Sequence, residues 1–139
     1  MKPKPKLKLM FICVGNSCRS QMAEGFARHH AGDRIEVASG GTAPAGYVSP
    51  NAVAVMREVG IDISSHRSTG IDSEALLEYD YVITMGCSDR DVCPADFTGV
   101  SRDWGIRDPV SRPIEVFRHV RDEIEMKVMA LLEEILGEG

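Results

Sequence analysis

The sequence predicts an α/β fold: a three-layer sandwich in which helices flank a central, four-stranded parallel sheet. Short apolar runs alternate along the chain with longer segments whose apolar residues recur every three or four positions, and this alternation is typical of parallel sheets. The runs have few polar interruptions, as expected for strands that are buried on both faces. At 139 residues, the chain is long enough for one such domain and too short for two. We therefore treat residues 1–139 as a single domain, with the lysine-rich residues 1–6 as a flexible arm.

Four short apolar segments are expected to be the strands of this sheet. They are Leu7–Cys13, Ile35–Ala38, Tyr81–Met85 and Val100–Trp104. In open α/β sheets, ligands bind at the carboxyl ends of the strands. The residues that follow the first and third strands are therefore the first candidates for a functional site.

The segments between and after the strands are expected to be helical. The first runs from Gln21 to His30, a short one lies around Leu76, and the last runs from Pro113 to about Leu136. A further helix is expected to be capped by Ser49 and to end before Gly60, with a buried stripe made of Ala52, Val55, Met56 and Val59. The last helix has the clearest pattern, since its apolar residues are spaced by threes and fours: Phe117, Val120, Ile124, Val128, Leu131 and Ile135.

Composition narrows the possible partners and compartments. The formal net charge of −5 argues against nucleic acid or an anionic membrane as a partner. The apolar run from Leu9 to Val14 is too short for a signal peptide or a membrane span, so we expect a cytoplasmic protein, and we expect a monomer. Four cysteines in such a protein predict redox or nucleophilic chemistry rather than a structural disulfide framework.

The chain is organised around one stretch, Cys13-Val14-Gly15-Asn16-Ser17-Cys18-Arg19-Ser20. A loop of small residues between a strand and a helix can turn its backbone N–H groups toward one anion, and the helix adds its positive end. The planar fork of Arg19 matches a tetrahedral oxyanion, and the same donors favour a thiolate. We therefore predict that Val14 to Ser20 form an oxyanion-binding loop and that Cys13 is a nucleophile aimed at the bound ion.

Other residues are assigned supporting roles. Asn16 and Ser20 are expected to hold the loop or to orient the thiolate through hydrogen bonds. Cys18 directly precedes Arg19, so we expect its side chain to point away from Cys13. Asp108 precedes a proline, which disfavours helix, and a carboxyl group on a loop there can give a proton to a leaving oxygen.

Cys87 and Cys93 follow the third expected strand. Because the ends of parallel strands share one edge of a sheet, Cys87 is expected to approach Cys13. Within a regular helix, Cys87 and Cys93 would lie roughly 9 Å apart along the axis, whereas the Cα atoms of a disulfide are at most about 7 Å apart, so pairing them requires the segment to rearrange. Two unrelated thiols are the alternative. A zinc site made of all four cysteines is another, but their spacing fits zinc knuckles poorly and places Arg19 beside a cation.

These motifs resemble those of low-molecular-weight protein tyrosine phosphatases and, within that fold, of thioredoxin-coupled arsenate reductases. The loop continues as Gln21-Met22-Ala23-Glu24-Gly25, and the match goes on through residues 60–64, 85–87, 93–94, 103–104, 108–109 and 118–124. It covers nearly the whole chain beyond the lysine-rich arm. The pair Cys87 and Cys93 favours the reductases, because the phosphatases lack it.

The resemblance implies a mechanism for arsenical resistance. Cys13 attacks arsenate held by the loop and Arg19, and Asp108 assists the loss of an oxygen as water. Cys87 then attacks Cys13 and releases arsenite, and Cys93 forms a disulfide with Cys87 that thioredoxin reduces. No tightly bound cofactor is implied. A phosphatase that hydrolyses phosphotyrosine-like esters with Cys13, Arg19 and Asp108 is the main alternative, and a non-catalytic oxyanion or redox sensor is a third.

The sequence departs from the family at two places. After Asp108-Pro109 the family often has Ala-Gly-Lys, whereas this chain has Val110-Ser111-Arg112. Some members bind potassium through an asparagine, a glutamate, a serine and an aspartate; Asn16, Glu24 and Ser39 match the first three, but Thr69 takes the fourth place. We therefore expect no metal. His66, in another segment similar to the family, is expected to cap or to pack.

Overall fold

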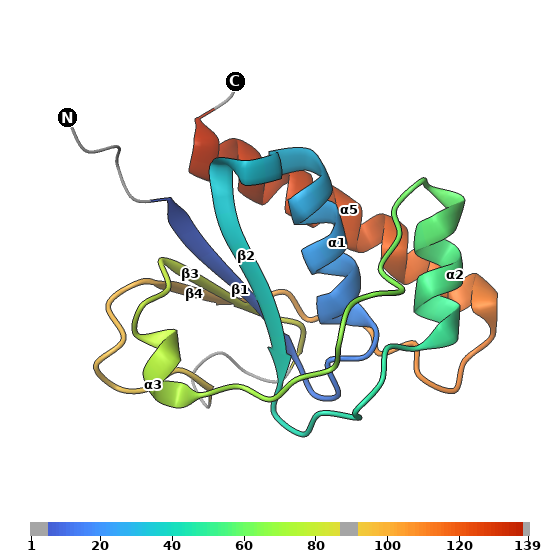
Figure 1. The fold of residues 1–139 in the computed structure, drawn as a ribbon, viewed down its shortest axis with the longest axis horizontal. Helices are drawn as coiled ribbons and strands as arrows, with labels where there is room; N and C mark the ends of the chain where they lie inside the picture. The colour runs from blue at the N-terminus through green and yellow to red at the C-terminus, as the bar shows by residue number, and fades with distance from the viewer. Residues whose placement is uncertain (1–5, 87–91, 138–139) are drawn as a thin grey trace.

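The protein has a sheet of four parallel strands in the order β2-β1-β3-β4. A computed structural model describes residues 6–86 and 92–137 (Figure 1); residues 1–5 of the expected arm and Cys87 lie outside them. The strands are β1 (Leu7–Cys13), β2 (Ile35–Gly41), β3 (Tyr81–Thr84) and β4 (Val100–Asp103). The predicted fold class is confirmed, and β2 extends three residues beyond the expected segment.

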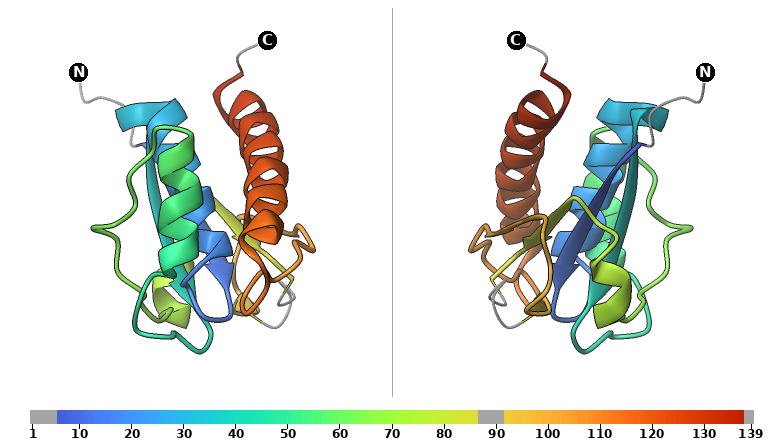
Figure 2. Two further views of the ribbon diagram at one scale, coloured as in Figure 1. Left: turned by 90° about the vertical axis from the view of Figure 1, so that its right-hand side faces the viewer. Right: turned by 90° about the vertical axis from the view of Figure 1, so that its left-hand side faces the viewer.

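The helices lie on both faces of the sheet, as the three-layer prediction requires. Three of them pack together on one face (Figures 1 and 2): α1 (Arg19–Ala31), α2 (Pro50–Glu58) and α5 (Ile114–Leu136). A 3₁₀ turn, η1 (Gly32–Arg34), leads from α1 into β2. The short helix α3 (Ser73–Leu76) covers the other face.

Alternate residues of β1 enter the two halves of the core. Leu9, Phe11 and Cys13 belong to the buried cluster beneath α1, α2 and α5. Met10 and Ile12 belong to the cluster beneath α3. This alternation follows from the two-residue period of a strand. It fixes the face of Cys13, the last residue of β1, as the one on which α1 begins.

The carboxyl ends of β1 and β3 meet at the point where the chain crosses between the two sides of the sheet. From β1 the chain runs to β2 on one side, whereas β3 pairs with β1 on the other. Met85 continues the pairing, because its N–H donates to the Ile12 carbonyl at 2.9 Å. Such a switch point is where open α/β sheets bind ligands, and here it is bordered by Cys13.

Three local expectations are corrected. Val59 was expected in the buried stripe of α2 but is 39% exposed, because the helix ends at Glu58. Ser49 stands at the N-cap of α2, but its side chain makes no capping hydrogen bond. The four-residue spacing of Met22, Phe26 and His30 predicts one packed face of α1, but His30 is only partly buried, unlike the other two.

Replacing Gly41 by alanine is expected to lower the free energy of unfolding. A Cβ atom at Gly41 would lie 2.6 Å from the Val14 carbonyl oxygen and 3.0 Å from the Asn16 backbone nitrogen. Overpacking of this kind costs about 1–3 kcal/mol, and here the loop backbone itself must move. Urea unfolding, followed by the fluorescence of Trp104, measures the loss.

The matched control is Gly70→Ala, because Gly70 forms a β-bridge with Gly41. A Cβ atom at Gly70 meets only Pro44 Cγ, at 3.7 Å, so its effect is expected to stay within about 0.5 kcal/mol. Equal stability of the two variants would contradict the close approach of Gly41 to the loop.

Candidate active site

The loop between β1 and α1 turns its carbonyl groups outward. Four of them accept backbone N–H groups of residues 42–49 at 2.8–3.2 Å: Cys13, Val14, Gly15 and Ser17 pair with Thr42, Ala43, Ala45 and Ser49. In a planar trans peptide the N–H group points opposite to the carbonyl, so the N–H groups of the loop face inward. Together with the N-terminus of α1, which begins at Arg19, they form a concave set of donors suited to an anion.

The Cys13 sulfur is the acceptor at the centre of this arrangement. It lies 2.9 Å from Ser20 Oγ and 3.2 Å from the Asn16 backbone nitrogen. Asn16 Nδ2 donates to Ser20 Oγ at 2.8 Å, so Ser20 can direct its own hydrogen at the sulfur. Cys13 is only 3% exposed. Two polar groups of the loop therefore surround a buried sulfur at the end of β1.

Arg19 joins three parts of the site. It is buried, and its Nη1 donates to the carbonyl oxygens of Met85 at 2.7 Å and Ile106 at 2.9 Å. Its Nη2 lies 3.7 Å from Asp108 Oδ2. The guanidinium therefore ties α1 to the end of β3 and to the loop that carries Asp108, and its remaining N–H groups are the ones that an oxyanion would have to use.

Asp108 lies on a loop, as predicted, at the edge of a hollow of about 210 Å³ that also borders Cys13 and Arg19. Its side chain is 53% exposed, and its Oδ1 accepts the Val110 N–H at 3.0 Å. Ser111, which replaces the glycine frequent in the family, has φ 64°, a conformation that costs a serine more than a glycine. The backbone is therefore left-handed at the position where the sequence departs from the family.

If Asp108 gives a proton to the leaving oxygen of the oxyanion substrate, as the sequence predicts, replacing it by asparagine should slow turnover of that substrate by about 10²-fold. This is the usual contribution of a general acid. Asparagine can keep the contact to the Val110 N–H but cannot give up a proton. The steady-state kcat should therefore fall more than the affinity for the oxyanion. An unchanged kcat would show that water supplies the proton.

Cys18 borders the same hollow as Cys13. It is 2% exposed, and its sulfur lies 3.6 Å from Ser17 Oγ. Burial raises the pKa of the Cys18 thiol, and hydrogen bonds from Ser17 and Ser49 offset this only in part. The thiol form of Cys18 is therefore favoured at neutral pH, and Cys18 is poorly suited to act as a nucleophile.

The potential potassium ligands are close together but are already engaged. Glu24 accepts the Ser39 hydroxyl at 2.6 Å on one carboxylate oxygen and Arg28 Nε at 2.8 Å on the other. Asn16 Oδ1 accepts the Thr69 N–H at 2.8 Å. The oxygens that a cation would need thus face donors, and Arg28 supplies a positive charge. These residues do not fit a potassium site, and the described residues hold no other cluster of three or more His, Cys, Asp or Glu side chains suited to a metal.

Of the two cysteines that follow β3, Cys93 is among the residues that the structure describes. Cys93 is half-buried and packs against the cluster beneath α3, which is the opposite face of the sheet from Cys13. Cys87 lies outside the described residues, so its expected approach to Cys13 stays a prediction. Its neighbour Gly86 is held beside the loop, because a Cβ there would lie 3.4 Å from Arg19 Nη1.

Several residues of the site carried no signal that singled them out in the sequence. Segment 42–49 supports the loop through its backbone, and Ser68 Oγ donates to the Gly15 carbonyl at 2.9 Å. Gln21 is fully buried and binds Asn16. For Gln21, the sequence offered two indications: its place in the family motif, and a polar side chain directly after the loop on the inward side of a helix.

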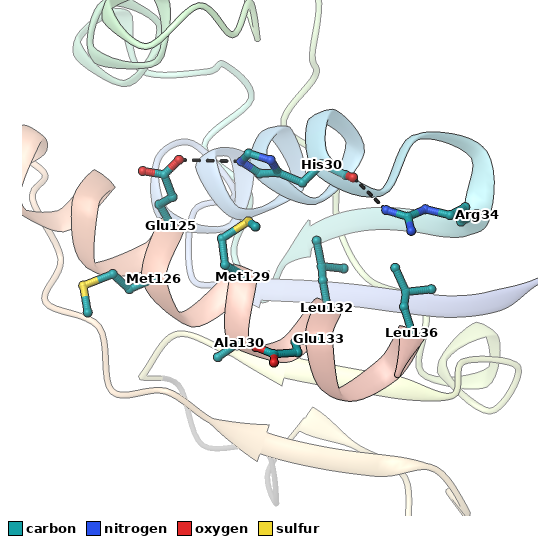
Figure 3. A pocket seen from close by; sticks show the side chains of 9 residues that line it. All are labelled: His30, Arg34, Glu125, Met126, Met129, Ala130, Leu132, Glu133 and Leu136. Carbon is teal, nitrogen blue, oxygen red and sulfur yellow. Dashed lines mark hydrogen bonds and ion pairs between the residues drawn. The ribbon is translucent and has the colours of Figure 1, made fainter. Parts of the chain in front are cut away.

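A second hollow, of about 650 Å³, lies between α1 and α5 (Figure 3). His30 and Glu125, which both line it, contact each other with 3.6 Å between Nε2 and Oε2, and Met126 and Met129 belong to the same lining. It lies at the far end of α1 from Arg19, and its lining includes no cysteine. It therefore does not belong to the Cys13 site.

No helix in the described part of the chain is both long and apolar enough to cross a membrane.

The fold and the loop define a class of protein in which a cysteine and an arginine border one hollow at the carboxyl end of the first strand. The chain belongs to the family of low molecular weight phosphotyrosine protein phosphatases, which matches residues 8–138.

Within this family, the chain is similar to arsenate reductases. Arsenate reductase 2 of Staphylococcus epidermidis is 47% identical over 125 residues, which span 88% of this chain and 94% of that protein. An arsenate reductase of Staphylococcus aureus is 46% identical with the same coverage.

Solved structures agree with this similarity. An arsenate reductase in the phosphate binding state has a TM-score of 0.81 and 40% identity, and the match covers 93% of this chain and 98% of that one. The thioredoxin-dependent arsenate reductase Cg_ArsC1' of Corynebacterium glutamicum has a TM-score of 0.83 and 32% identity, with 97% and 64% covered. The YwlE arginine phosphatase of Geobacillus stearothermophilus, at 29% identity and a TM-score of 0.78 over 95% and 94% of the two chains, shares the fold with a different activity.

Proposed function

We propose that the protein reduces arsenate to arsenite, with Cys13 as nucleophile. The observation that carries the proposal is the position of the Cys13 sulfur. It lies 2.9 Å from Ser20 Oγ and accepts the Asn16 N–H, inside a loop whose N–H groups face inward. The similarity to arsenate reductases, at 46–47% identity over most of the chain, supports this substrate.

The first step forms a bond between the Cys13 sulfur and arsenic. The inward N–H groups and the remaining donors of Arg19 hold the arsenate oxygens. Asp108, 3.7 Å from Arg19 Nη2, gives a proton to the oxygen that leaves as water. The product is a covalent thiol–arsenate adduct in which arsenic is still pentavalent.

The second step supplies two electrons from two thiolates. Cys87 attacks the Cys13 sulfur, the sulfur–arsenic bond breaks with its electron pair on arsenic, and arsenite leaves behind a Cys13–Cys87 disulfide. Cys93 then attacks Cys87, which restores the Cys13 thiolate and leaves a Cys87–Cys93 disulfide. Cys13 and Cys93 pack in clusters on opposite faces of the sheet, which supports a relay through a third thiol rather than direct exchange.

Thioredoxin is the proposed reductant of the Cys87–Cys93 disulfide. The support is the thioredoxin-dependent arsenate reductase among the similar structures, together with a Cys13 that is too buried for a protein thiol to reach. The cytoplasm is the proposed compartment, because thiols are kept reduced there, and a monomer is the proposed working form. No tightly bound cofactor is needed, since the electrons come from thiols.

The test is arsenate-dependent oxidation of thioredoxin by the purified protein, followed by mapping of the paired cysteines. The proposal expects a stoichiometric disulfide between Cys87 and Cys93 when thioredoxin is left out. The variant Cys87→Ser should lose catalytic arsenate reduction, and continued turnover by it would contradict the relay.

The alternative is a phosphatase that uses Cys13, Arg19 and Asp108 alone. The family membership and the same anion loop make some hydrolysis of aryl phosphates expected. Rapid turnover of an aryl phosphate, with no thiol oxidation by arsenate, would favour this alternative. Slow alkylation of Cys13 at neutral pH would instead favour a non-catalytic sensor.

A further inference from the structure

His66 stands at the outer end of a chain of hydrogen bonds that reaches the Cys13 sulfur. It lies between α2 and α3, and its Nδ1 is 2.9 Å from Gln21 Oε1. Gln21, in the first turn of α1, is completely buried. Its Nε2 contacts the backbone and side-chain oxygens of Asn16, both at 3.0 Å. Asn16 in turn points its backbone N–H at Cys13 Sγ, 3.2 Å away.

The orientations in this chain follow from groups that can only donate or only accept. The Thr69 N–H donates to Asn16 Oδ1 at 2.8 Å, which fixes the Asn16 amide. Gln21 Nε2 lies within 3.0 Å of the Asn16 backbone oxygen, of Asn16 Oδ1 and of the Arg67 carbonyl oxygen, and none of these can donate. The Gln21 end near these oxygens is therefore the NH₂ group. Its Oε1 faces His66, so His66 Nδ1 must carry the hydrogen.

We infer that His66 is a positioning residue for Cys13, acting through Gln21 and Asn16. Asn16 has φ 47°, a left-handed conformation that persists in a non-glycine residue when its surroundings hold it. Gln21 supplies that hold on the Asn16 carbonyl and side chain, and His66 satisfies the buried oxygen of Gln21. The inference rests on Cys13 being the nucleophile of the proposed function.

Loss of the His66 hydrogen leaves the buried Oε1 of Gln21 without its donor. Reversing the amide would not help, because its oxygen would then face three other oxygens. The Gln21 side chain must shift, and Asn16 loses part of its support. A looser Asn16 N–H donates less well to the sulfur, and a weaker donor favours the thiolate less.

The charged surroundings of His66 determine which control is useful. Glu24 Oε2 lies 3.9 Å from His66 Nδ1. Arg28, His29 and Asp62 line the same surface hollow, of about 280 Å³. His29 is exposed and stands on α1 without a place in the chain of hydrogen bonds described above. The variant His29→Leu therefore removes an imidazole from the same hollow and leaves that chain intact.

The test compares His66→Leu, which removes the donor, with His66→Asn, whose amide nitrogen replaces Nδ1 in nearly the same place. The rate of Cys13 alkylation by iodoacetamide is followed from pH 5 to 9, with the modified cysteine identified by mass spectrometry. For His66→Leu, we expect the midpoint of the pH profile to rise by about half to one unit and the rate at pH 7 to fall about three- to tenfold, since one unit is a tenfold change in thiolate. His66→Asn and His29→Leu should follow the wild type.

Folding is checked by circular dichroism and by Trp104 fluorescence. His66→Gln, whose amide reaches beyond the Nδ1 position, is a second variant that misplaces the donor and should behave like His66→Leu. A wild-type profile in either folded variant would overturn the inference, and so would a His66→Asn as impaired as the variant without a donor. Alkylation uses neither arsenate nor thioredoxin, so its outcome is separate from the test of arsenate reduction.

Discussion

Replacing Cys13 by serine is expected to abolish arsenate reduction, with a loss on the order of 10⁴-fold or more. A serine hydroxyl is a far weaker nucleophile at neutral pH than a thiolate. Even if it attacked arsenate, its oxygen could not form the disulfide that supplies the two electrons. The measurement is arsenite formed per enzyme in the presence of excess thioredoxin, thioredoxin reductase and NADPH.

The same variant should still bind the oxyanion. The carbonyl groups that hold the loop accept backbone donors from residues 42–49, and Arg19 is held by the carbonyls of Met85 and Ile106. None of these contacts uses the Cys13 sulfur. Calorimetric titration with phosphate should therefore show binding close to that of the wild type.

The matched variant is Cys18→Ser, at the other cysteine of the loop. It removes a sulfur that borders the same hollow but whose thiol form is favoured by burial, so it is expected to keep measurable turnover. Arsenate reduction by Cys13→Ser, or its equal loss in Cys18→Ser, would contradict the assignment of Cys13 as the nucleophile.

The loop could be predicted from the sequence because its chemistry is contiguous. A cysteine, a glycine, small polar residues and an arginine follow one another between an apolar run and a helical pattern. Strand position then fixed the face on which Cys13 lies, since β1 alternates between two core clusters. The order of residues along the chain is sufficient to predict a site when all the residues that form it lie in one loop.

The support of the loop could not be predicted in the same way. Ser68, Thr69 and residues 42–49 reach the loop only because the chain returns to it after β2 and after α2. The partners of Gln21 likewise include Arg67 and His66, some 45 residues away in sequence. A pattern of residue types does not show such tertiary contacts. From the sequence, Gln21 could therefore be interpreted only as part of a family motif, and His66 only as a packing or capping residue.

The misplaced element ends have a similar origin. Val59 continues the apolar spacing of α2, but the helix ends at Glu58, and Gly60 takes φ 82° just beyond it. Val59 is the C-cap residue between the last helical residue and Gly60, so the expected end of the helix differs from the observed end by one residue. The exposed side chain of Val59 is the consequence.

Replacing Cys93 by serine is expected to limit arsenate reduction to about one turnover per enzyme, because exchange can stop at the first disulfide of the relay. Cys13 and Cys87 are both present in this variant, so the adduct can form and arsenite can leave once. The Cys13–Cys87 disulfide then has no resolving thiol. Cys13 is 3% exposed, which keeps thioredoxin from the Cys13 side of that bond. Rapid-quench measurement of arsenite, with mass spectrometry of the trapped disulfide, gives both quantities.

The control for Cys93→Ser is hydrolysis of an aryl phosphate by the same variant. In the proposed mechanism that reaction uses only Cys13, Arg19 and Asp108 and forms no disulfide, so we expect the variant to retain whatever rate the wild type has. Loss of both activities would indicate damage to the fold, because Cys93 packs against the cluster beneath α3. Repeated arsenate turnover with thioredoxin would instead show that the Cys13–Cys87 disulfide is reduced directly. The sheet would then not separate the two ends of the relay, and the packing of Cys93 on the face opposite Cys13 would have no part in catalysis.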